Sequence, residues 1–240
     1  MIYITGDTHG AFNRIIDFCE RIGTTKEDIM IILGDAGINY HLNDRDERLK
    51  EKLDDVPITI FCIHGNHEQR PYAIGGYEEM EWHGGIVYME PKHPSILFAK
   101  DGEIYDIEDI KHLVIGGAYS VDKKYRIARG YGWWENEQPS DEIKAYVESQ
   151  IDKHGFDVIL SHTCPLKYEP IEMFLSMIDQ STVDKSTEVW LDSIEERVKY
   201  KAWFCGHWHT NKRIDKMHFL YGDFEFSSML KAQEIIDEKN

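Results

Sequence analysis

Short apolar runs alternate with amphipathic segments along most of the chain. An unbroken apolar run such as residues 29–33 is typical of a strand buried on both faces. Across residues 12–22, apolar side chains instead recur at three- and four-residue spacing, which predicts a helix that Gly23 ends. By these criteria we expect strands at residues 2–5, 29–33, 58–63, 96–99, 104–107, 112–115, 158–160 and 202–205, helices at residues 12–22, 43–54 and 187–200, and terminal β structure over residues 212–226.

The order of these elements predicts how they pack. The first five alternate strand, helix, strand, helix and strand, which predicts a parallel sheet with right-handed crossovers. In the middle of the chain, Asp101-Gly102 lies between two short strands and predicts a β-hairpin over residues 96–107. Ser140 is a predicted N-cap, followed by acidic residues in the first turn of a helix that ends near Gly155.

Residues 118–139 have no clear period, so we expect a long loop there. Its aromatic content argues against disorder. No repeat, low-complexity tract or Pro/Gly-rich linker divides the chain, so we expect one domain over residues 1–240. The aromatic residues of the loop are Tyr119, Tyr125, Tyr131, Trp133 and Trp134.

Composition narrows the class of protein. Hydrophobic residues make up 42% of the 240 residues and charged residues 30%, as in a soluble globular protein. No apolar run approaches the roughly 20 residues of a membrane helix, and the N-terminus lacks the features of a signal peptide. We therefore expect a cytoplasmic protein that does not bind membranes.

Charge and cysteine content exclude further classes of function. The formal net charge of −17 argues against stable nucleic-acid binding, which needs a positive surface. The four cysteines form no CxxC pair, so we expect buried, reduced thiols rather than a structural zinc site. The oligomeric state is not predicted by any of these features.

Five short polar segments stand out, and four of them directly follow a predicted strand. In open α/β sheets, ligands collect at the carboxyl ends of strands, so we expect these segments to converge on one edge. Each alone has an ordinary explanation as a turn, a helix start or a structural histidine. The whole set in this order does not. The segments are Gly6-Asp7-Thr8-His9-Gly10, Gly34-Asp35, Gly65-Asn66-His67-Glu68, Ser161-His162 and Gly206-His207-Trp208-His209.

The side chains of these segments predict a metal site. Two carboxylates, one amide and several imidazoles form a mixed oxygen and nitrogen set, which suits Mn, Fe or Zn better than Ca²⁺ or Cu(I). In Asp7-x-His9 and again in His207-x-His209, two side chains alternate on a short extended turn, so both can face one ion. The preceding glycines allow the backbone to turn sharply close to the metal.

With these motifs the chain resembles the calcineurin-like metallophosphoesterase superfamily, whose pattern is DxH, GD, GNH(D/E), H and GHxH. The motifs span Asp7 to His209, and the SHTCP and GHWHTNKR segments look most like small bacterial and phage phosphatases of this superfamily. The resemblance implies an α/β fold of four layers, an α/β/β/α sandwich with two mixed β-sheets.

The resemblance also implies two divalent ions, with Mn²⁺ expected first and Fe, Zn, Ni or Co as alternatives. Two close ions need an anionic bridge to offset their repulsion, and Asp35 would provide it. The first ion would be held by Asp7, His9 and His209, and the second by Asn66, His162 and His207.

The implied mechanism is hydrolysis without a phosphoenzyme. Two ions about 3.5–4 Å apart would lower the pKa of a shared water, and the bridging hydroxide would attack phosphorus in line. The ions would also stabilise charge in the transition state. His67 would lie beside the metals and would donate a proton to the leaving oxygen or stabilise its charge.

The chain departs from the protein Ser/Thr phosphatases of this superfamily, which carry GDxVDRG. Ile38 and Asn39 replace the Asp that orients the catalytic histidine and the Arg that binds phosphate. The orienting partner of His67 is therefore open, since the adjacent Glu68 need not point the same way. Other histidines, including His64, match no motif and are expected to be structural or exposed.

Another cation must then meet the substrate phosphate. We single out Arg70, Arg126 and Arg129, because the arginine fork matches phosphate oxygens. Ordinary salt bridges are the alternative explanation for all three. The aromatic residues around Arg126 and Arg129 either pack the loop or form a platform for a substrate ring.

Three hypotheses follow for the function. The first is hydrolysis of phosphate monoesters, with a phosphoprotein, a nucleotide or a small ester as the phosphorylated substrate. The second is a phosphodiesterase or nuclease that uses the same metals. The third, a non-catalytic binding scaffold, is disfavoured because all seven expected ligands and His67 are present.

Overall fold

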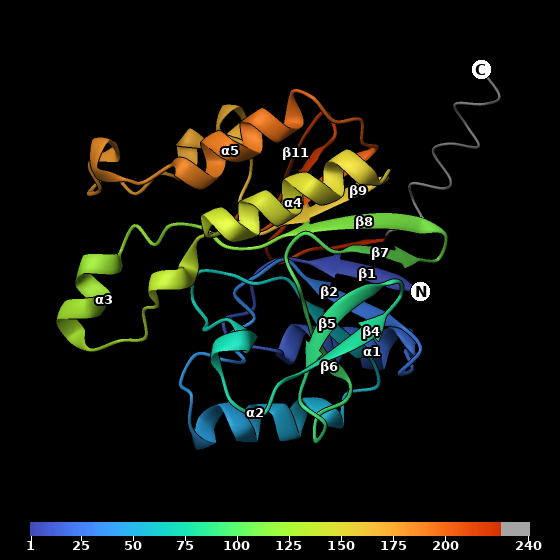
Figure 1. Ribbon diagram of the computed structural model, residues 1–240. Coiled ribbons are helices and arrows are strands. Elements are labelled where there is room, and N and C mark those ends of the chain that lie inside the picture. The colour runs from blue at the N-terminus through green and yellow to red at the C-terminus, as the bar shows by residue number, and fades with distance from the viewer. Residues whose placement is uncertain (227–240) are drawn as a thin grey trace.

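The computed structural model describes residues 1–226. Two β-sheets pack face to face, with helices on both outer faces (Figure 1). The predicted α/β/β/α sandwich is therefore confirmed. Residues 227–240, which the single-domain prediction also covers, lie outside the described residues.

The first sheet has seven strands and is mixed. Its four central strands are parallel, and the strands at both edges run antiparallel to their neighbours. In spatial order they are β13 (Phe224–Phe226), β1 (Ile2–Thr5), β2 (Ile29–Ile32), β3 (Thr59–Cys62), β6 (Ile96–Ala99), β5 (Gly85–Met89) and β4 (Glu78–Trp82).

The second sheet has six strands and is also mixed. Four neighbouring strands are parallel, and the two edge strands pair antiparallel. In spatial order they are β11 (Lys212–Ile214), β12 (Met217–Phe219), β10 (Ala202–Cys205), β9 (Val158–Ser161), β8 (Ile110–Ile115) and β7 (Ile104–Ile107).

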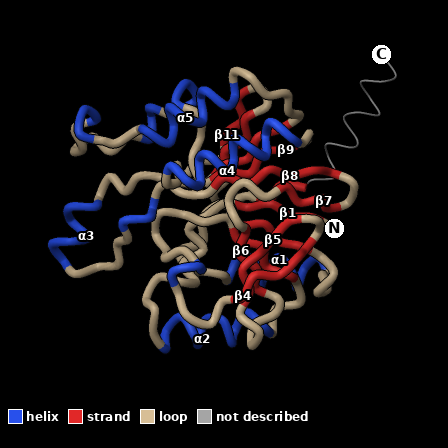
Figure 2. The backbone as a smooth tube through the Cα atoms, viewed as in Figure 1, coloured by secondary structure: helices blue, strands red, loops and turns tan. Residues whose placement is uncertain are grey.

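Three layers of apolar packing hold the sandwich together. The layer between the sheets includes Ile4, Phe61 and Phe204. On the outer face of the seven-stranded sheet lie α1 (Asn13–Ile22) and α2 (Asp44–Asp54), and on that of the six-stranded sheet lie α4 (Asp141–Lys153) and α5 (Ser186–Glu195). Since side chains alternate along a strand, each central strand contributes to two layers, which explains the unbroken apolar runs. Figure 2 shows the strands stacked between these helices.

The predicted hairpin over residues 96–107 is wrong. β6 pairs with β3 and β5 in one sheet, whereas β7 pairs with β8 in the other, so the chain crosses between sheets at Asp101-Gly102. All four residues of β6 are buried, and a buried strand needs neighbours on both sides. The Asp101 carboxylate holds the crossing by accepting the Gly116 N–H at 2.6 Å and pairing with Arg70.

Residues 118–139 are more regular than the sequence predicts. They contain α3 (Lys123–Arg129) and a 3-10 turn at Glu135–Glu137. Residues 166–182 carry three further 3-10 turns, at Leu166–Tyr168, Ile171–Met173 and Gln180–Thr182. Both segments protrude from the same side of the sandwich (Figure 1). β4 and β5 were also not predicted.

Two other local predictions, for the N-cap Ser140 and for the cysteines, are confirmed. Ser140 is the N-cap of α4, and its hydroxyl accepts the Ile143 N–H at 3.3 Å. All four cysteines are buried and free. Within residues 1–226, no helix combines the length and the apolar character required to cross a membrane.

Candidate metal centre

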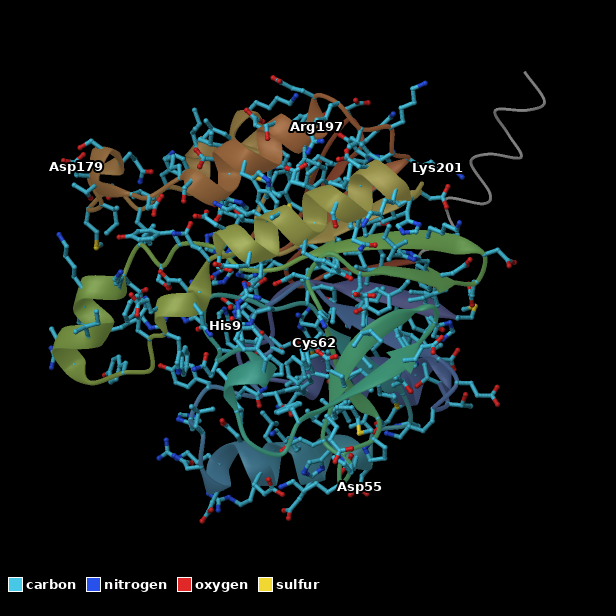
Figure 3. The ribbon with its side chains drawn as sticks, viewed as in Figure 1. His9, Asp55, Cys62, Asp179, Arg197 and Lys201 are labelled. Atoms are coloured by element: carbon cyan, nitrogen blue, oxygen red, sulfur yellow. The ribbon has the colours of Figure 1, made fainter. Side chains whose placement is uncertain are left out.

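The seven predicted ligands converge at one edge of the sandwich. Their loops follow β1, β2, β3, β9 and β10 at the carboxyl ends of parallel strands, and they come from both sheets. In Figure 3, His9 is labelled at this edge, and Cys62 ends the strand that leads to Asn66. The loops bind one another directly, since the His9 N–H donates to the Asp35 carbonyl at 2.8 Å and the His207 N–H donates to Asp7 Oδ1 at 2.9 Å.

One group of candidate ligands consists of Asp7, His9 and His209. The two Nε2 atoms of His9 and His209 are 3.0 Å apart, and His209 Nε2 lies 3.2 Å from Asp7 Oδ2. Asp7 Oδ2 is buried and accepts no hydrogen bond from residues 1–226. Ligands that bind one ion at about 2.0–2.2 Å lie about 3 Å from each other, so these spacings fit a divalent ion among the three atoms.

A second group consists of Asn66, His162 and His207. Asn66 Oδ1 lies 2.8 Å from His162 Nε2 and 3.1 Å from His207 Nδ1. His162 Nδ1 lies 2.8 Å from the Leu33 carbonyl, which can only accept, so in the neutral imidazole Nδ1 carries the proton and Nε2 a lone pair. With this neutral ring, two acceptors face each other across 2.8 Å, which is repulsive unless a cation lies beside both. This donor set also fits a divalent ion.

Asp35 lies between the two groups. It forms potential metal-binding clusters with His9 and His67 on one side and with Asp7 and His162 on the other. Asp35 Oδ1 is 3.6 Å from His162 Nε2 and accepts the backbone N–H of His67 at 2.7 Å. The sequence predicts Asp35 as a bridge, and this position is compatible with that role.

Backbone strain is concentrated at these ligands. Nine non-glycine residues among residues 1–226 have positive φ, and four of them are predicted ligands: His9, Asp35, His207 and His209. Such conformations cost free energy and persist where the surroundings impose them, often at functional sites. No sequence pattern indicates this strain.

Glycines of the motifs leave room for the ligands. A Cβ on Gly34 would overlap Nδ1 of His162, one on Gly65 would overlap Asp35, and one on Gly206 would overlap Asp7. Each glycine thus permits a ligand from another loop to approach the backbone closely. This role differs from the predicted one, a sharp backbone turn close to the metals, which stays a prediction.

The charges of the site shift several pKa values. Burial alone would raise the pKa of Asp7, but the imidazoles of His209, His162 and His9 outweigh it and lower that pKa below the usual range. Burial lowers the pKa of His207 to about 3, so its ring is neutral and offers a lone pair at neutral pH. Contact with Asp7 raises the pKa of His209 against its burial.

His67 lies beside the predicted ligands. Burial lowers its pKa, with Asp35 opposing and Arg126 and His9 reinforcing the shift. Within residues 1–226, no hydrogen bond to its ring identifies an orienting partner. Glu68 points elsewhere: its carboxylate accepts the N–H groups of Gly65 and Gly37, and burial raises its pKa to about 8.

The three predicted phosphate-binding arginines occupy different environments. Arg70 is buried in an ion pair with Asp101 and donates to the Asn136 carbonyl at 2.8 Å, as in the salt-bridge alternative, while its Nη2 has no partner within residues 1–226. Arg126 is buried, donates to Ser120 Oγ at 3.3 Å and is close enough to lower the His67 pKa. Arg129 is exposed and lies over the Tyr125 ring.

Sequence reasoning missed several residues that support the site. Ser120 Oγ accepts the Asn66 amide at 2.9 Å, which directs Asn66 Oδ1 toward the histidines. Arg14 donates to the carbonyls of Gly6 and Asp7, both at 2.8 Å, and so braces the first loop. Arg45 lines a cavity of about 400 Å³ together with His9 and His67. None of these belongs to a short motif, so no local signal marks them.

Comparisons with known proteins agree with this geometry. Residues 1–211 match the family model described as calcineurin-like phosphoesterase. No curated protein sequence gives a significant match. The crystal structure of TT1561 of Thermus thermophilus is similar, with a TM-score of 0.52 and 11% identity over 92% of this chain and 87% of that chain.

A second solved structure, the sulfate thiohydrolase SoxB of Thermus thermophilus in complex with glycerol, aligns with a TM-score of 0.37 and 12% identity. The alignment covers 90% of this chain and 38% of that one. At such low identity, the TT1561 likeness speaks only for the fold. The match to the family model, which covers most of the sequence, shows that the chain belongs to the calcineurin-like phosphoesterase family.

Proposed function

We propose that this chain is a dinuclear metal-dependent phosphatase that hydrolyses phosphate monoesters. The observation that carries the proposal is the 2.8 Å approach of His162 Nε2 to Asn66 Oδ1, with His162 Nδ1 directed to the Leu33 carbonyl. The group of Asp7, His9 and His209 lies beside it, with Asp35 between the two. An arrangement of this kind is unfavourable without cations and favourable with them.

Each ligand group has a separate role in the proposal. One ion would be held by Asp7, His9 and His209. The other ion would be held by Asn66, His162 and His207. The Asp35 carboxylate would bind both ions. Such ions, Mn²⁺ first among them, supply Lewis acidity that lowers the pKa of water and offsets the phosphate charge. The hydrogen bonds that join His162 to Leu33 and Asn66 to Ser120 orient the ligands before any ion binds.

His67 would act on the leaving group. It lies beside Asp35 and edge-on to the His9 ring, and within residues 1–226 no hydrogen bond engages its ring nitrogens, so they can meet the substrate. A ring nitrogen of His67 would donate its proton, or a hydrogen bond, to the departing oxygen. A His67→Ala variant should therefore lose more activity on esters with poor leaving groups than on p-nitrophenyl phosphate.

Arg45 is the cation that we propose for the substrate phosphate. Its side chain is exposed, at the start of α2, and lines the same cavity as His9 and His67. An arginine fork there matches two oxygens of a phosphate dianion. Arg126 lies deeper and would act on the site through its charge rather than by contact.

The test is paired hydrolysis of p-nitrophenyl phosphate and bis-p-nitrophenyl phosphate, by metal-stripped protein and after addition of Mn²⁺. We expect Mn²⁺-dependent turnover that favours the monoester. An Asp35→Asn variant should lose at least about a hundredfold in turnover, whereas Asp17→Asn, a matched change at an exposed carboxylate of α1, should not.

Other outcomes would change the assignment. A clear preference for the diester would make the chain a phosphodiesterase on the same site. Absence of turnover on both esters, with metal bound and the fold intact, would overturn the proposal in favour of a binding scaffold.

A further inference from the structure

A second cavity, of about 330 Å³, opens beside the metal centre. Asp35, His67 and His207 form part of its wall, so it is continuous with the proposed reaction site. The opposite wall comes from residues 173–185, and Val121 and Asp122 close a further side. The two protruding segments of the fold therefore meet around this one cavity. We call it the side pocket.

Apolar and aromatic groups make up much of the side-pocket wall. The rings of Phe174 and Trp208 are stacked, with centroids 5.7 Å apart and an interplanar angle of 29°. Met173 and Leu175 expose 38% and 53% of their surface, although they line the cavity. Apolar side chains left open to water next to a reaction site are typical of a pocket that receives an apolar part of the substrate.

The charges around the side pocket are one-sided. Asp122, Glu169, Asp184 and Glu188 all line it, whereas its single lysine, Lys185, is paired with Glu169 at 2.6 Å. A second phosphate or carboxylate on the substrate would therefore meet more acidic than basic side chains. The group that enters must be uncharged or cationic.

Glu188 supplies a specific polar contact. Its side chain is buried, with 4% exposure, and its Oε1 accepts the Thr163 hydroxyl at 2.9 Å. Its Oε2 is buried and has no hydrogen-bond partner within residues 1–226. A buried carboxylate oxygen without a donor is costly, and a ligand in the side pocket whose donor reached Oε2 would gain a strong hydrogen bond. Burial also raises the pKa of Glu188 to about 7.

We propose that the side pocket selects the alcohol part of the phosphate ester, an uncharged aromatic ring whose N–H or O–H donates to Glu188 Oε2. The inference rests on the proposed function, because a phosphate at the metal centre is what places the ring in this pocket. Phe174 and Trp208 would pack against the ring, and Glu188 would act as the residue that determines specificity.

The first test measures binding alone, with 3-methylindole and 3-methylbenzofuran, which differ by an N–H in place of a ring oxygen. Ligand-observed NMR titration should show that the wild-type chain binds the indole about tenfold more tightly, as expected for a hydrogen bond to a buried acceptor. Glu188→Met, which removes the acceptor at similar length, should abolish this preference. Glu188→Gln should reduce the indole preference, and this variant replaces Glu188→Met in the test if Glu188→Met does not fold.

Thr163→Val is the matched control, because it removes the hydroxyl that Glu188 accepts but leaves Oε2 in place. We expect this variant to keep the indole preference. An indole preference that is equal in the wild-type chain and in both Glu188 variants would overturn the proposal. A preference that is lost in Thr163→Val but kept in the Glu188 variants would also overturn it, because Glu188 would then act only on the loop of His162.

The second test uses 2-(indol-3-yl)ethyl phosphate and its benzofuran analogue as substrates, which share one type of leaving group. A higher kcat/KM for the indole ester in wild type, lost in Glu188→Met, supports the proposal. Turnover of both esters without preference overturns the side-pocket proposal and leaves the phosphatase intact. If the first test shows the binding preference but neither ester is turned over, the side-pocket proposal stands and the phosphatase proposal is overturned.

Discussion

A single backbone carbonyl sets the chemistry of His162. Because the Leu33 carbonyl occupies Nδ1, the lone pair of His162 is directed to Asn66 and the metal centre. Leu33 and Gly34 are adjacent, and the absence of a side chain at Gly34 is what lets the ring approach this carbonyl. Two neighbouring residues in one loop thus orient a ligand that comes from the other sheet.

Gly34→Ala should therefore abolish metal binding. Gly34 has a φ of +92°, and a Cβ there would overlap the His162 ring, so we expect a loss of about 2–4 kcal/mol of unfolding free energy. Urea unfolding and metal content by mass spectrometry measure the two effects. Gly23→Ala is the matched control: its φ is +75° but no atom lies within 4 Å, so it should cost about 1 kcal/mol and keep the metal. Full metal content in Gly34→Ala would contradict the orienting role.

His112 makes stability depend on pH. Its ring is fully buried, and burial lowers its pKa to about 4. The unfolded value is about 6.5, so the folded state favours the neutral ring. The neutral His112 ring therefore contributes to the free energy of unfolding. This contribution is complete above about pH 6.5 and is lost as pH falls from 6.5 toward 4, to a total of about 3 kcal/mol at most.

His112→Leu should remove that part of the pH dependence. Urea unfolding of wild-type and variant between about pH 7 and pH 4.5 measures the difference in slope. His154→Gln, at an exposed position, should retain the wild-type slope. Parallel curves for wild-type and His112→Leu would show that His112 is protonated at no cost in the folded chain.

At the scale of elements, α1 stabilises the loop that carries Asp7 and His9. Arg14, in the first turn of this helix, donates to Thr5 Oγ1 at 2.6 Å and to the carbonyls of Gly6 and Asp7. These contacts fix the loop between a strand and the helix that covers it. The apolar face of α1 predicts its position on the sheet, but not this second role.

Arg14→Lys should lower metal affinity about tenfold, because an ammonium group cannot reproduce the forked contacts. Isothermal titration of the metal-free protein with Mn²⁺ measures the change. Arg21→Lys, in the exposed last turn of the same helix, is the control and should bind Mn²⁺ like the wild-type chain. If Arg14→Lys also binds normally, the loop is held by other contacts.

At the scale of the whole molecule, the metal centre joins the two sheets. Asp7, Asp35 and Asn66 follow strands of the seven-stranded sheet, whereas His162 and the Gly206–His209 loop follow strands of the six-stranded sheet. An ion bound by ligands from both sheets would therefore resist separation of the sheets. The unfolded chain lacks this arrangement and would bind the ion weakly.

Removal of metal should thus destabilise the whole chain. At a free Mn²⁺ concentration about 100 times the dissociation constant, binding should add about 2.7 kcal/mol to the unfolding free energy. Denaturation with chelator and with Mn²⁺ measures the difference. The Asp35→Asn variant should show a much smaller gain, and an equal gain would point to binding elsewhere on this acidic protein.

From the sequence alone, the strands, the helices and the five polar segments could be recognised, because these features depend on local patterns. The sandwich and the assignment of the seven ligands were implied by the family resemblance that the segments carry. Apolar periodicity indicates strands and helices, and Gly-Asp and Gly-His turns after strands indicate an edge with ligands. Asp7, His9 and their partners could therefore be identified as a candidate site before the structure was known.

Only the tertiary structure decided which strands pair and which supporting residues meet the ligands. Asp101-Gly102 has the local chemistry of a hairpin, yet the pairing of β6 with β3 and β5 outweighs it. Arg70 has the chemistry of a phosphate ligand, but Asp101 engages it. Ser120 and Glu188 act through partners distant in sequence, Asn66 and Thr163, and such contacts exist only once the chain has folded.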